Sequence, residues 1–168
     1  EVDEHIVPDE TVPLMEVVKS VIASLETRAA RRQMAISLTD SRAEGANRLL
    51  MRGFADEINE VFHNLIENAI KYGFENTVIE IDVEQQREDQ VMISVTNRGE
   101  TIAEKHLSRL TERFYRVDKA RSRQIGGTGL GLAIVKHIVN RHRGMMKVSS
   151  SADGVTRFAV SLPVLSER

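Results

Sequence analysis

The sequence predicts a single domain of the mixed α/β (α+β) class, built from amphipathic helices and antiparallel strands. Three stretches carry apolar residues at every third or fourth position, which is the spacing of a helix with one buried face. Shorter stretches alternate apolar and polar residues and come in pairs joined by turns, as antiparallel strands do. The length of 168 residues suits one full hydrophobic core, because two domains would each be small.

The composition excludes several classes of protein. A net charge of -2 and a charged fraction of 29% describe an ordinary soluble protein, with no basic excess for nucleic-acid binding. The chain has no cysteine, which rules out disulfides and thiolate metal sites and suits a reducing cytosol. No apolar run is long enough to span a membrane, and no signal peptide opens the chain. Because the first residue is glutamate rather than methionine, we expect a piece of a longer protein.

The N-terminal third of the chain contains a linker, a helix and two short strands. Residues 1–10 are acidic and include a proline, which is typical of a tail or linker. A helix is predicted from 13 to about 33, where an apolar stripe ends in a cluster of arginines. Short strands are predicted at 35–39 and 48–52, on either side of a turn-rich segment.

The helix around residues 63–73, HNLIENAIKYG, carries two faces of different character. One face is an apolar stripe and belongs in the core. Asn64, Asn68 and Lys71 form a narrow polar row beside it, because they are four and three residues apart. Asparagine is a poor helix former on a merely wet face, whereas its amide oxygen suits a hard cation such as Mg²⁺. The row indicates a magnesium-nucleotide site, although a solvated or helix-capping face explains these residues equally well.

Two pairs of strands follow. Segments 77–84 and 91–96 alternate cleanly, with a polar hairpin at 85–90 between them, and predict an antiparallel pair with one wet face. Segments 145–149 and 155–162 form the second pair, joined by an Asp-Gly turn.

The segment between these pairs breaks the pattern. A turn is predicted at 97–101 and a short helix at 103–112, followed by residues 113–127 with little apolar periodicity. Five basic residues and one acidic residue give this last stretch a local charge of +4 in a protein that is negative overall. A solvated loop is one explanation. A mobile cationic lid over an anionic ligand is the other, because long loops without secondary structure are often lids.

Glycines stand at alternate positions where the next helix begins. Gly127, Gly129 and Gly131 precede or open a helix predicted from 130 to 143. A helix N-terminus offers unpaired N–H groups and a partial positive charge, and glycine lets phosphate oxygens come close to the backbone. This arrangement predicts a phosphate cradle. Its spacing differs from that of the Rossmann dinucleotide motif.

Four segments in a fixed order, HNLIENAIKY, TNRGETI, ERFYRVD and GGTGLGLAIV, carry a resemblance to a known family. The set resembles the catalytic and ATP-binding domain of sensor histidine kinases, in the superfamily that also holds gyrase, Hsp90 and MutL. The segments resemble, in order, the N box, the first glycine box, the F box and the second glycine box of these kinases. They span roughly residues 60–160, which is most of the folded chain.

The resemblance implies a fold and a division of the chain. The expected fold is a two-layer sandwich, in which a mixed sheet of about five strands is covered on one face by three helices, with a mobile ATP lid. Residues 1–10 would be a linker, as the tail of a missing dimerisation helix, and residues 11–165 the catalytic domain.

The resemblance also implies roles for individual residues. Asn68 is expected to bind Mg²⁺ with help from Asn64, and Lys71 to reach the phosphates of ATP. Phe114 is expected to anchor the lid, and Arg116 to contact phosphate from it. The remaining nucleotide contacts are expected at the adenine (Tyr72, Asn97, Gly99, Ile102), in the lid (Tyr115) and, through backbone N–H groups, at the phosphates (Gly127, Thr128, Gly129, Leu130, Gly131).

Two positions depart from the family pattern. The first glycine box usually begins with aspartate, whose carboxylate accepts a hydrogen bond from the adenine amino group, and here that position is Asn97. An amide oxygen accepts the same bond without charge assistance, so adenine selection is expected to be weaker by about 1 kcal/mol. The second glycine of the box is replaced by Thr101.

The activity implied by the resemblance is transfer of the ATP γ-phosphoryl group to a histidine on a dimerisation domain absent from this chain. None of the five histidines is followed by an acidic residue, as the acceptor would be. The full protein is expected to be a membrane-anchored homodimer in a bacterial inner membrane, with this domain in the cytoplasm and a response regulator downstream. A gyrase-like ATPase is disfavoured, because Asn64 stands where its general-base glutamate would be. A catalytically degenerate nucleotide binder, favoured only by Asn97, is the alternative.

Overall fold

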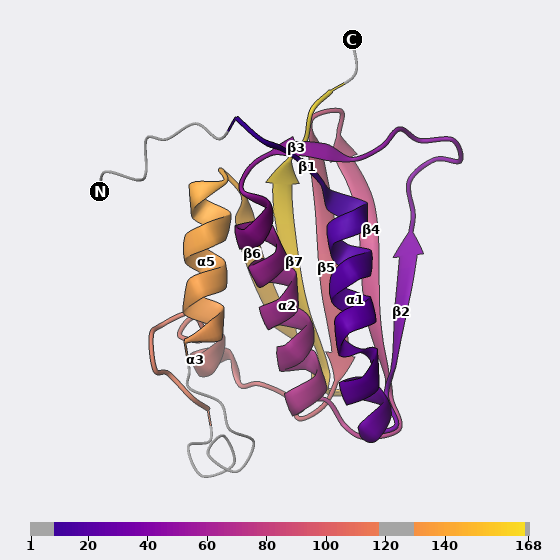
Figure 1. Cartoon of the computed structure of the whole chain (residues 1–168). Helices are drawn as coiled ribbons and strands as arrows, with labels where there is room; N and C mark the ends of the chain where they lie inside the picture. The colour runs from indigo at the N-terminus through magenta and orange to yellow at the C-terminus, as the bar shows by residue number, and fades with distance from the viewer. Residues whose placement is uncertain (1–8, 118–129, 167–168) are drawn as a thin grey trace.

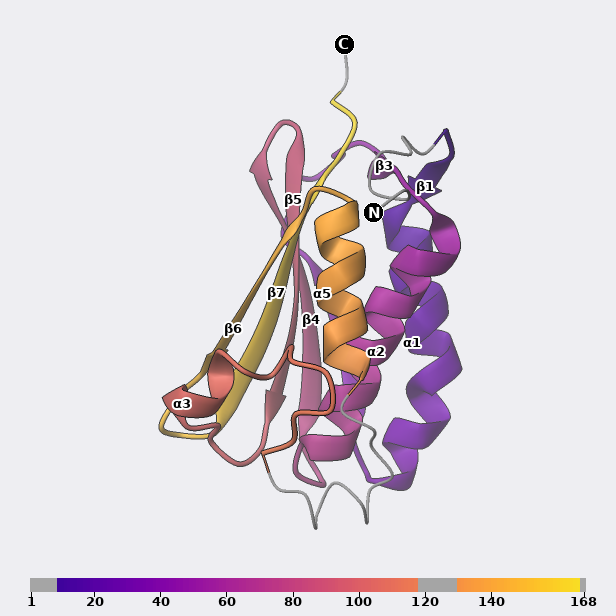
Figure 2. The ribbon, with the colours of Figure 1, turned by 90° about the vertical axis from the view of Figure 1, so that its left-hand side faces the viewer.

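The computed structural model describes residues 9–117 and 130–166. Its helices and strands form two layers, a sheet and a row of helices on one face of it (Figures 1 and 2). The elements are β1 (Thr11–Pro13), α1 (Leu14–Arg31), β2 (Ala35–Asp40), β3 (Leu50–Arg52), α2 (Ala55–Tyr72), β4 (Val78–Arg87), β5 (Gln90–Arg98), α3 (Glu104–Leu107), α5 (Gly131–Arg141), β6 (Met145–Ser150) and β7 (Val155–Pro163). In the described part of the chain, no helix combines the length and apolarity needed to cross a bilayer.

The main sheet has five strands in the order β2-β4-β5-β7-β6. β2 runs parallel to β4, and every other neighbouring pair is antiparallel, so the sheet is mixed. The alternation in the sequence explains which face is covered: Ile79, Ile81 and Val83 of β4 are fully buried. The intervening Glu80 and Glu84 are exposed on the other face. The predicted fold class and the mixed sheet of five strands are confirmed.

The helices α1, α2 and α5 cover one face of this sheet, as predicted (Figure 2). Burial in α2 follows the helical period, because its apolar stripe faces the sheet. The buried residues of α2 are Ile58, Val61, Phe62, Leu65, Ile66, Ala69 and Ile70. The side chains at the remaining positions of α2 lie outside this buried stripe.

A second, two-stranded sheet was not predicted. β1 pairs with β3 in antiparallel register, with Thr11 opposite Arg52, and the carbonyl of Glu10 accepts a hydrogen bond from Gly53 N at 3.0 Å. Three residues are too few to show an alternating pattern, so sequence periodicity gives no signal there. This pair leads directly into the start of α2.

Two predicted connections have different bounds in the structure. The polar hairpin predicted at 85–90 is largely strand, because β4 and β5 extend into it and leave Glu88 and Asp89 as the turn. The turn predicted at 97–101 begins later, since Asn97 lies in β5 opposite Thr156 of β7.

The helix predicted at 103–112 is also shorter in the structure. Only the four residues of α3 are helical, and turns follow to residue 114. None of the four is buried, and of the predicted helix only Leu107 and Leu110 pack against the core, which is too little contact to hold a longer helix.

A cluster of side chains joins the start of α2 to the end of α5. Arg141 Nε lies 3.0 Å from Oε1 of Glu57, and its guanidinium stands 5.3 Å from the ring centroid of Phe54. The backbone N of Phe54 donates to Nε2 of His142 at 3.1 Å, and Nδ1 of His142 donates to the carbonyl of Ile138 at 2.8 Å. His142 is therefore a buried structural histidine that fastens the two helices at one end.

Candidate functional site

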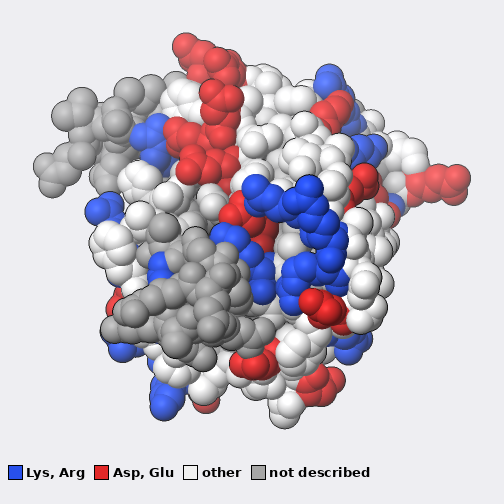
Figure 3. Space-filling view, turned by 60° about the horizontal axis from the view of Figure 1, so that its bottom comes forward, with Lys and Arg blue, Asp and Glu red and all other residues white. Residues whose placement is uncertain are grey.

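The predicted polar row lies along α2 between its buried stripe and solvent. Asn64, Asn68 and Lys71 are all half-buried, while the residues that flank them on the stripe are buried. The helical period of α2 thus places three polar groups in line at the edge of the core. All three keep part of their surface in solvent, and Lys and Arg side chains gather on the face of the molecule where α1 and α2 end (Figure 3).

Asn64 faces the beginning of α5. Its Nδ2 donates to the carbonyl of Glu60 at 2.9 Å, which fixes the orientation of the amide. A Cβ atom added at Gly131 would lie 3.2 Å from Oδ1 of Asn64, with no other contact within 4 Å outside this side chain. The polar row and the glycine-led helix start, 67 positions apart in the sequence, are therefore neighbours.

Lys71 is held by a carboxylate on its own helix. Its Nζ lies 2.8 Å from Oε1 of Glu67, while Nη1 of Arg28 on α1 lies 3.1 Å and Nδ1 of His63 3.4 Å from Oε2. Partial burial acts to raise the pKa of Glu67, but hydrogen bonds and attraction from Lys71 and Arg28 outweigh it, so the pKa lies below its ordinary value. Three nitrogen groups thus share one carboxylate beside the row of asparagines.

Three glycines meet where α2 ends. Gly73 forms a bridge with Gly99, and Gly99 N donates to the carbonyl of Gly154 at 2.8 Å. A Cβ atom at Gly73 would lie 2.6 Å from the carbonyl of Ala69, and one at Gly154 would lie 2.2 Å from the carbonyl of Gly99. Gly154 also has φ +82°, a conformation that side chains disfavour. The close approach of these three segments is possible only because side chains are absent.

Asn97 lies next to this junction and is 5% exposed. Its Nδ2 would be 3.3 Å from a Cβ atom at Gly99. Within residues 9–117 and 130–166 its side-chain amide has no hydrogen bond. No side-chain N or O atom of the described residues is both fully buried and unpaired, so this amide is reached from the surface although the residue as a whole is buried. Such an amide is suited to reading a ligand's hydrogen-bonding group.

A hydroxyl network that the sequence analysis missed supports this end of the site. Thr156, opposite Asn97 on β7, shares a hydrogen bond of 2.9 Å with Oγ of Ser150, and Ser150 Oγ accepts from Ile102 N at 2.9 Å. Thr101, the departure from the glycine box, donates to the carbonyl of Ser151 at 2.9 Å. The first glycine box is thus fastened to the β6–β7 turn. The signal available in the sequence was Thr156 at the start of an otherwise apolar strand face.

The F box residues up to 117 lie beside α3. Tyr115 forms a hydrogen bond through its hydroxyl with Nδ1 of His106, and the guanidinium of Arg109 stands 4.4 Å from its ring centroid. Phe114 is 67% exposed and has φ +65°, whereas Arg116 is half-buried. Tyr115 is thus held against α3 at the start of the predicted lid, and the anchoring role expected of Phe114 stays a prediction.

Part of the predicted phosphate cradle lies outside the described residues. Gly127, Thr128 and Gly129 fall there, as does the predicted lid beyond residue 117. Leu130 caps α5 at its N-terminus and Gly131 is the first helical residue. The described part of the cradle is therefore the helix start itself.

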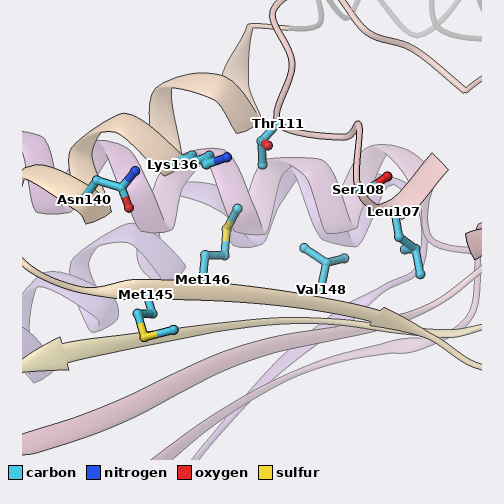
Figure 4. A pocket seen from close by; sticks show the side chains of 8 residues that line it. All are labelled: Leu107, Ser108, Thr111, Lys136, Asn140, Met145, Met146 and Val148. Atoms are coloured by element: carbon cyan, nitrogen blue, oxygen red, sulfur yellow. The ribbon is translucent and has the colours of Figure 1, made fainter. Parts of the chain in front are cut away.

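A cavity of about 360 Å³ lies apart from these residues, between α3, α5 and β6. Met146, Val148 and Lys136 point into it, while Met145 lies on the other side of the β6 strand (Figure 4). None of the predicted site residues in the described part of the chain lines it. The predicted nucleotide contacts of α2 and β5 therefore lie outside this cavity.

Comparison with known proteins supports a family assignment. Residues 53–166, more than half of the chain, match the family described as histidine kinase-, DNA gyrase B- and HSP90-like ATPases. The phosphate regulon sensor protein PhoR of Pseudomonas aeruginosa is 41% identical over 138 residues, covering 79% of this chain and 30% of that protein. Sensor histidine kinase WalK of Bacillus subtilis is 40% identical over 114 residues, covering 67% of this chain and 19% of WalK. The chain spans less than a third of the length of either relative.

Solved structures share the fold. The mycobacterial sensor histidine kinase MprB superposes with a TM-score of 0.80 at 22% identity, covering 94% of this chain and 99% of that one. Full-length ShkA, solved in complex with AMPPNP, gives a TM-score of 0.80 at 21% identity and covers 96% of this chain and 32% of that one. These likenesses show the fold alone. The family match establishes that the chain belongs to the histidine kinase-, DNA gyrase B- and HSP90-like ATPases, and the relatives at 40–41% identity identify it as an ATP-binding catalytic domain of the sensor histidine kinase type.

Proposed function

We propose that this chain binds magnesium-ATP between α2 and the start of α5 and transfers the γ-phosphoryl group to a histidine on a separate dimerisation domain. The contact between Asn64 and Gly131 is the observation that carries this proposal. It brings the hard oxygen donors of α2 beside the N-terminal end of α5, where N–H groups and the helix dipole favour phosphate. A triphosphate bound there would meet both groups at once.

The residues of α2 fit a magnesium ion bound through few protein atoms. Asn68 and Asn64 offer neutral amide oxygens, which suit Mg²⁺ when phosphates and waters complete its shell. No group of three His, Cys, Asp or Glu side chains with metal-binding geometry occurs in the described residues, so a closed protein cage is not the alternative there. Bound Mg²⁺ would supply neutralisation of phosphate charge.

The remaining phosphate contacts come from both sides of the site. Lys71, held by Glu67 at 2.8 Å, would bind phosphate from α2. From the other side we assign the backbone N–H groups of 127–131 and, from the lid, Arg116. Phosphoryl transfer asks a protein mainly to position the reactants and neutralise charge, which is what these groups can do.

The adenine end is assigned to the residues around the glycine junction. Tyr72 would lie beside the base, and the amide of Asn97 would read its amino group. Gly99 and Ile102 form the adjoining wall, in which Ile102 packs against the core and its N–H is held by Ser150. Full-length ShkA, which shares this fold, was solved in complex with AMPPNP, and this supports an ATP-type ligand for the present chain.

Transfer to a protein side chain fits this site better than hydrolysis. A hydrolytic relative needs a carboxylate as general base four residues before the metal-binding asparagine, and that residue is Asn64. The carboxylate of Glu67, one residue away from Asn68, is engaged by Lys71 and Arg28. Glu60 lies on the same row of α2 but one turn further back, eight residues before Asn68, and so does not occupy the place of that general base.

The partners follow from the relatives, which are sensor kinases of bacteria. We infer that residues 11–165 are the catalytic domain and that residues 1–10 connect it to a dimerisation domain carrying the acceptor histidine. The full protein would be a homodimer anchored in the inner membrane, with this domain in the cytoplasm. A response regulator would take the phosphoryl group from the histidine.

The test is a phosphoryl-transfer assay in two parts. The chain is incubated with Mg²⁺, ATP labelled in its γ-phosphate and a separately produced dimerisation domain from the same kinase. We expect label on the histidine of that domain, stable to base and labile to acid, and none on the chain alone. ATP binding without transfer to the cognate domain would contradict the proposed activity.

A further inference from the structure

The end of α2 needs hydrogen-bond donors from outside the helix. The last carbonyls of any helix have no N–H group of the same helix to accept from. Gly73 N donates to the carbonyl of Ala69 at 2.9 Å, but the chain then leaves in an extended conformation, with φ -71° and ψ 155° at Gly73. The left-handed turn that commonly satisfies further carbonyls is therefore not formed. The carbonyls of Ile70 and Lys71 depend on other donors.

Arg32, at the end of α1, supplies them. Its Nη1 donates to the carbonyl of Ile70, to that of Lys71 at 3.3 Å and to that of Gly73 at 2.8 Å. A cation is favourable at this end of a helix because it complements the helix dipole. Among the described residues no carboxylate pairs with Arg32, so its charge is directed at these carbonyls.

Arg32 is itself held by its backbone. It is the C-cap of α1, its N–H donates to the carbonyl of Ala29 at 3.0 Å, and its carbonyl accepts from Asn76 N at 3.4 Å. Gln33, with φ +56°, turns the chain so that Met34 packs beside the end of α2. The guanidinium therefore projects from a fixed point onto the last turn of α2.

The last turn of α2, whose carbonyls Arg32 bonds, carries several parts of the proposed nucleotide site. Lys71 and Tyr72 are the last two residues of α2. Gly73, whose carbonyl is bonded directly, forms the bridge to Gly99. Asn97 is part of β5 and lies two residues before Gly99. A shift of this turn would displace groups at both the phosphate end and the base end.

We propose that Arg32 is a positioning residue for nucleotide binding: it fixes the last turn of α2 and thereby sets the places of Lys71 and Tyr72. This inference rests on the proposed function, because it requires nucleotide to bind at α2. Arg32 lies behind the turn and acts through it. A residue that only stabilised the fold would change the melting temperature and leave the Kd of the folded protein unaltered.

The experiment compares three variants of the full chain. Arg32→Met keeps a long side chain and removes the charge and the donors. Arg32→Lys keeps the charge with less reach across several carbonyls. Arg31→Met is the matched control, since Arg31 is an exposed neighbour at the same helix end. Calorimetry gives the Kd for magnesium-AMPPNP, and hydrogen exchange follows the amides from 70 to 76.

We expect Arg32→Met to raise Kd about tenfold, from the loss of a cation at the helix end and of donors to half-buried carbonyls. Amides 70 to 76 should exchange faster in that variant, Arg32→Lys should recover part of the affinity, and Arg31→Met should match the unaltered chain. An unchanged Kd in folded Arg32→Met would overturn the role of Arg32. If Arg32→Met does not fold, an unchanged Kd in Arg32→Lys would overturn the role of Arg32. Failure of the unaltered chain to bind would overturn the proposed function instead.

Discussion

The side-chain oxygen of Asn64 lies 3.2 Å from the point at which a Cβ atom on Gly131 would stand. The two residues belong to α2 and α5, which pack side by side on the sheet (Figure 2). The amide of Asn64 cannot turn freely, because its nitrogen is bonded to the carbonyl of Glu60. A glycine at 131 therefore leaves open the space in front of a fixed oxygen.

Replacing Gly131 with alanine should weaken magnesium-ATP binding several-fold while leaving the fold intact. The new methyl group would press on Asn64, whereas alanine within a helix is itself favoured over glycine by up to about 1 kcal/mol. Calorimetry and thermal unfolding measure the two effects separately. Lys136→Ala, on an exposed position of the same helix, is the control. Unaltered affinity in Gly131→Ala would show that this space is not part of the site.

Replacing Asn68 with alanine should abolish the magnesium-dependent part of ATP affinity. The amide oxygen is the proposed ligand, and alanine offers none. The measurement is ATP titration with Mg²⁺ and with a chelator. Asn140→Ala is a matched control because Asn140 is exposed on α5. Equal magnesium dependence in Asn68→Ala and the unaltered chain would remove Asn68 from the metal site.

Replacing Asn97 with aspartate should tighten ATP relative to GTP by about 1 kcal/mol, or roughly fivefold. A carboxylate accepts the bond from the adenine amino group with charge assistance and cannot donate to the guanine oxygen. The ligand-free variant should also melt at a lower temperature, because a carboxylate would be buried at a position that is 5% exposed and has no described partner. Competition binding of the two nucleotides tests the selectivity, and an unchanged ratio would place base recognition elsewhere.

Replacing Glu67 with glutamine should remove a stabilising contribution that depends on pH. Burial opposes the ionised form of Glu67, but Lys71 and Arg28 outweigh it and lower its pKa below the ordinary 4.5. The carboxylate therefore stabilises the fold above pH 4.5, and this contribution is lost as pH falls through its lowered pKa.

The two proteins should differ by no more than about 1 kcal/mol near neutral pH, since the group is partly exposed and screened. Denaturant unfolding across a pH series measures this, and the difference should shrink in acid. Glu60→Gln removes one negative charge from an exposed position of the same helix and is the control. A difference that stays constant down to strongly acid pH would contradict the ion-pair explanation.

Replacing His142 with leucine should lower stability by about 1–2 kcal/mol without changing nucleotide affinity. The variant leaves Phe54 N without its acceptor, at the end of α2 remote from the nucleotide. Thermal unfolding and calorimetry are the measurements. His137→Leu, on an exposed position of the same helix, should leave stability nearly unchanged. Loss of affinity in folded His142→Leu would show that the two ends of α2 are coupled.

Much of the fold could be predicted because its elements bury one face each. The stripe from Ile58 to Ile70 and the alternation of Ile79, Ile81 and Val83 arise from contact with a single core, and such periodicity survives in the sequence. The three residues of β1 bury too little to leave a pattern. The same is true of α3, none of whose residues is buried.

The candidate site joins the asparagines of α2 to the start of α5, and in the structure Asn64 lies beside Gly131. Asn64 and Gly131 each had a local signal, the helical spacing of polar groups and the glycines at a helix start. Arg32 had no such signal in the sequence. It bonds the carbonyls of another helix, but an arginine at a helix end is common and looks like an ordinary terminal cation. Long-range hydrogen bonds to backbone leave no trace in local composition.

The junction of Gly73, Gly99 and Gly154 makes one wall of the proposed base site out of main chain. A substitution changes a side chain, and this wall of main chain has almost no side chains to change. We expect the choice of base in this protein to depend instead on the few side chains at the margin of this wall. Asn97 lies at this margin, so the asparagine that replaces the aspartate of the family pattern stands at a position where a side chain can be exchanged.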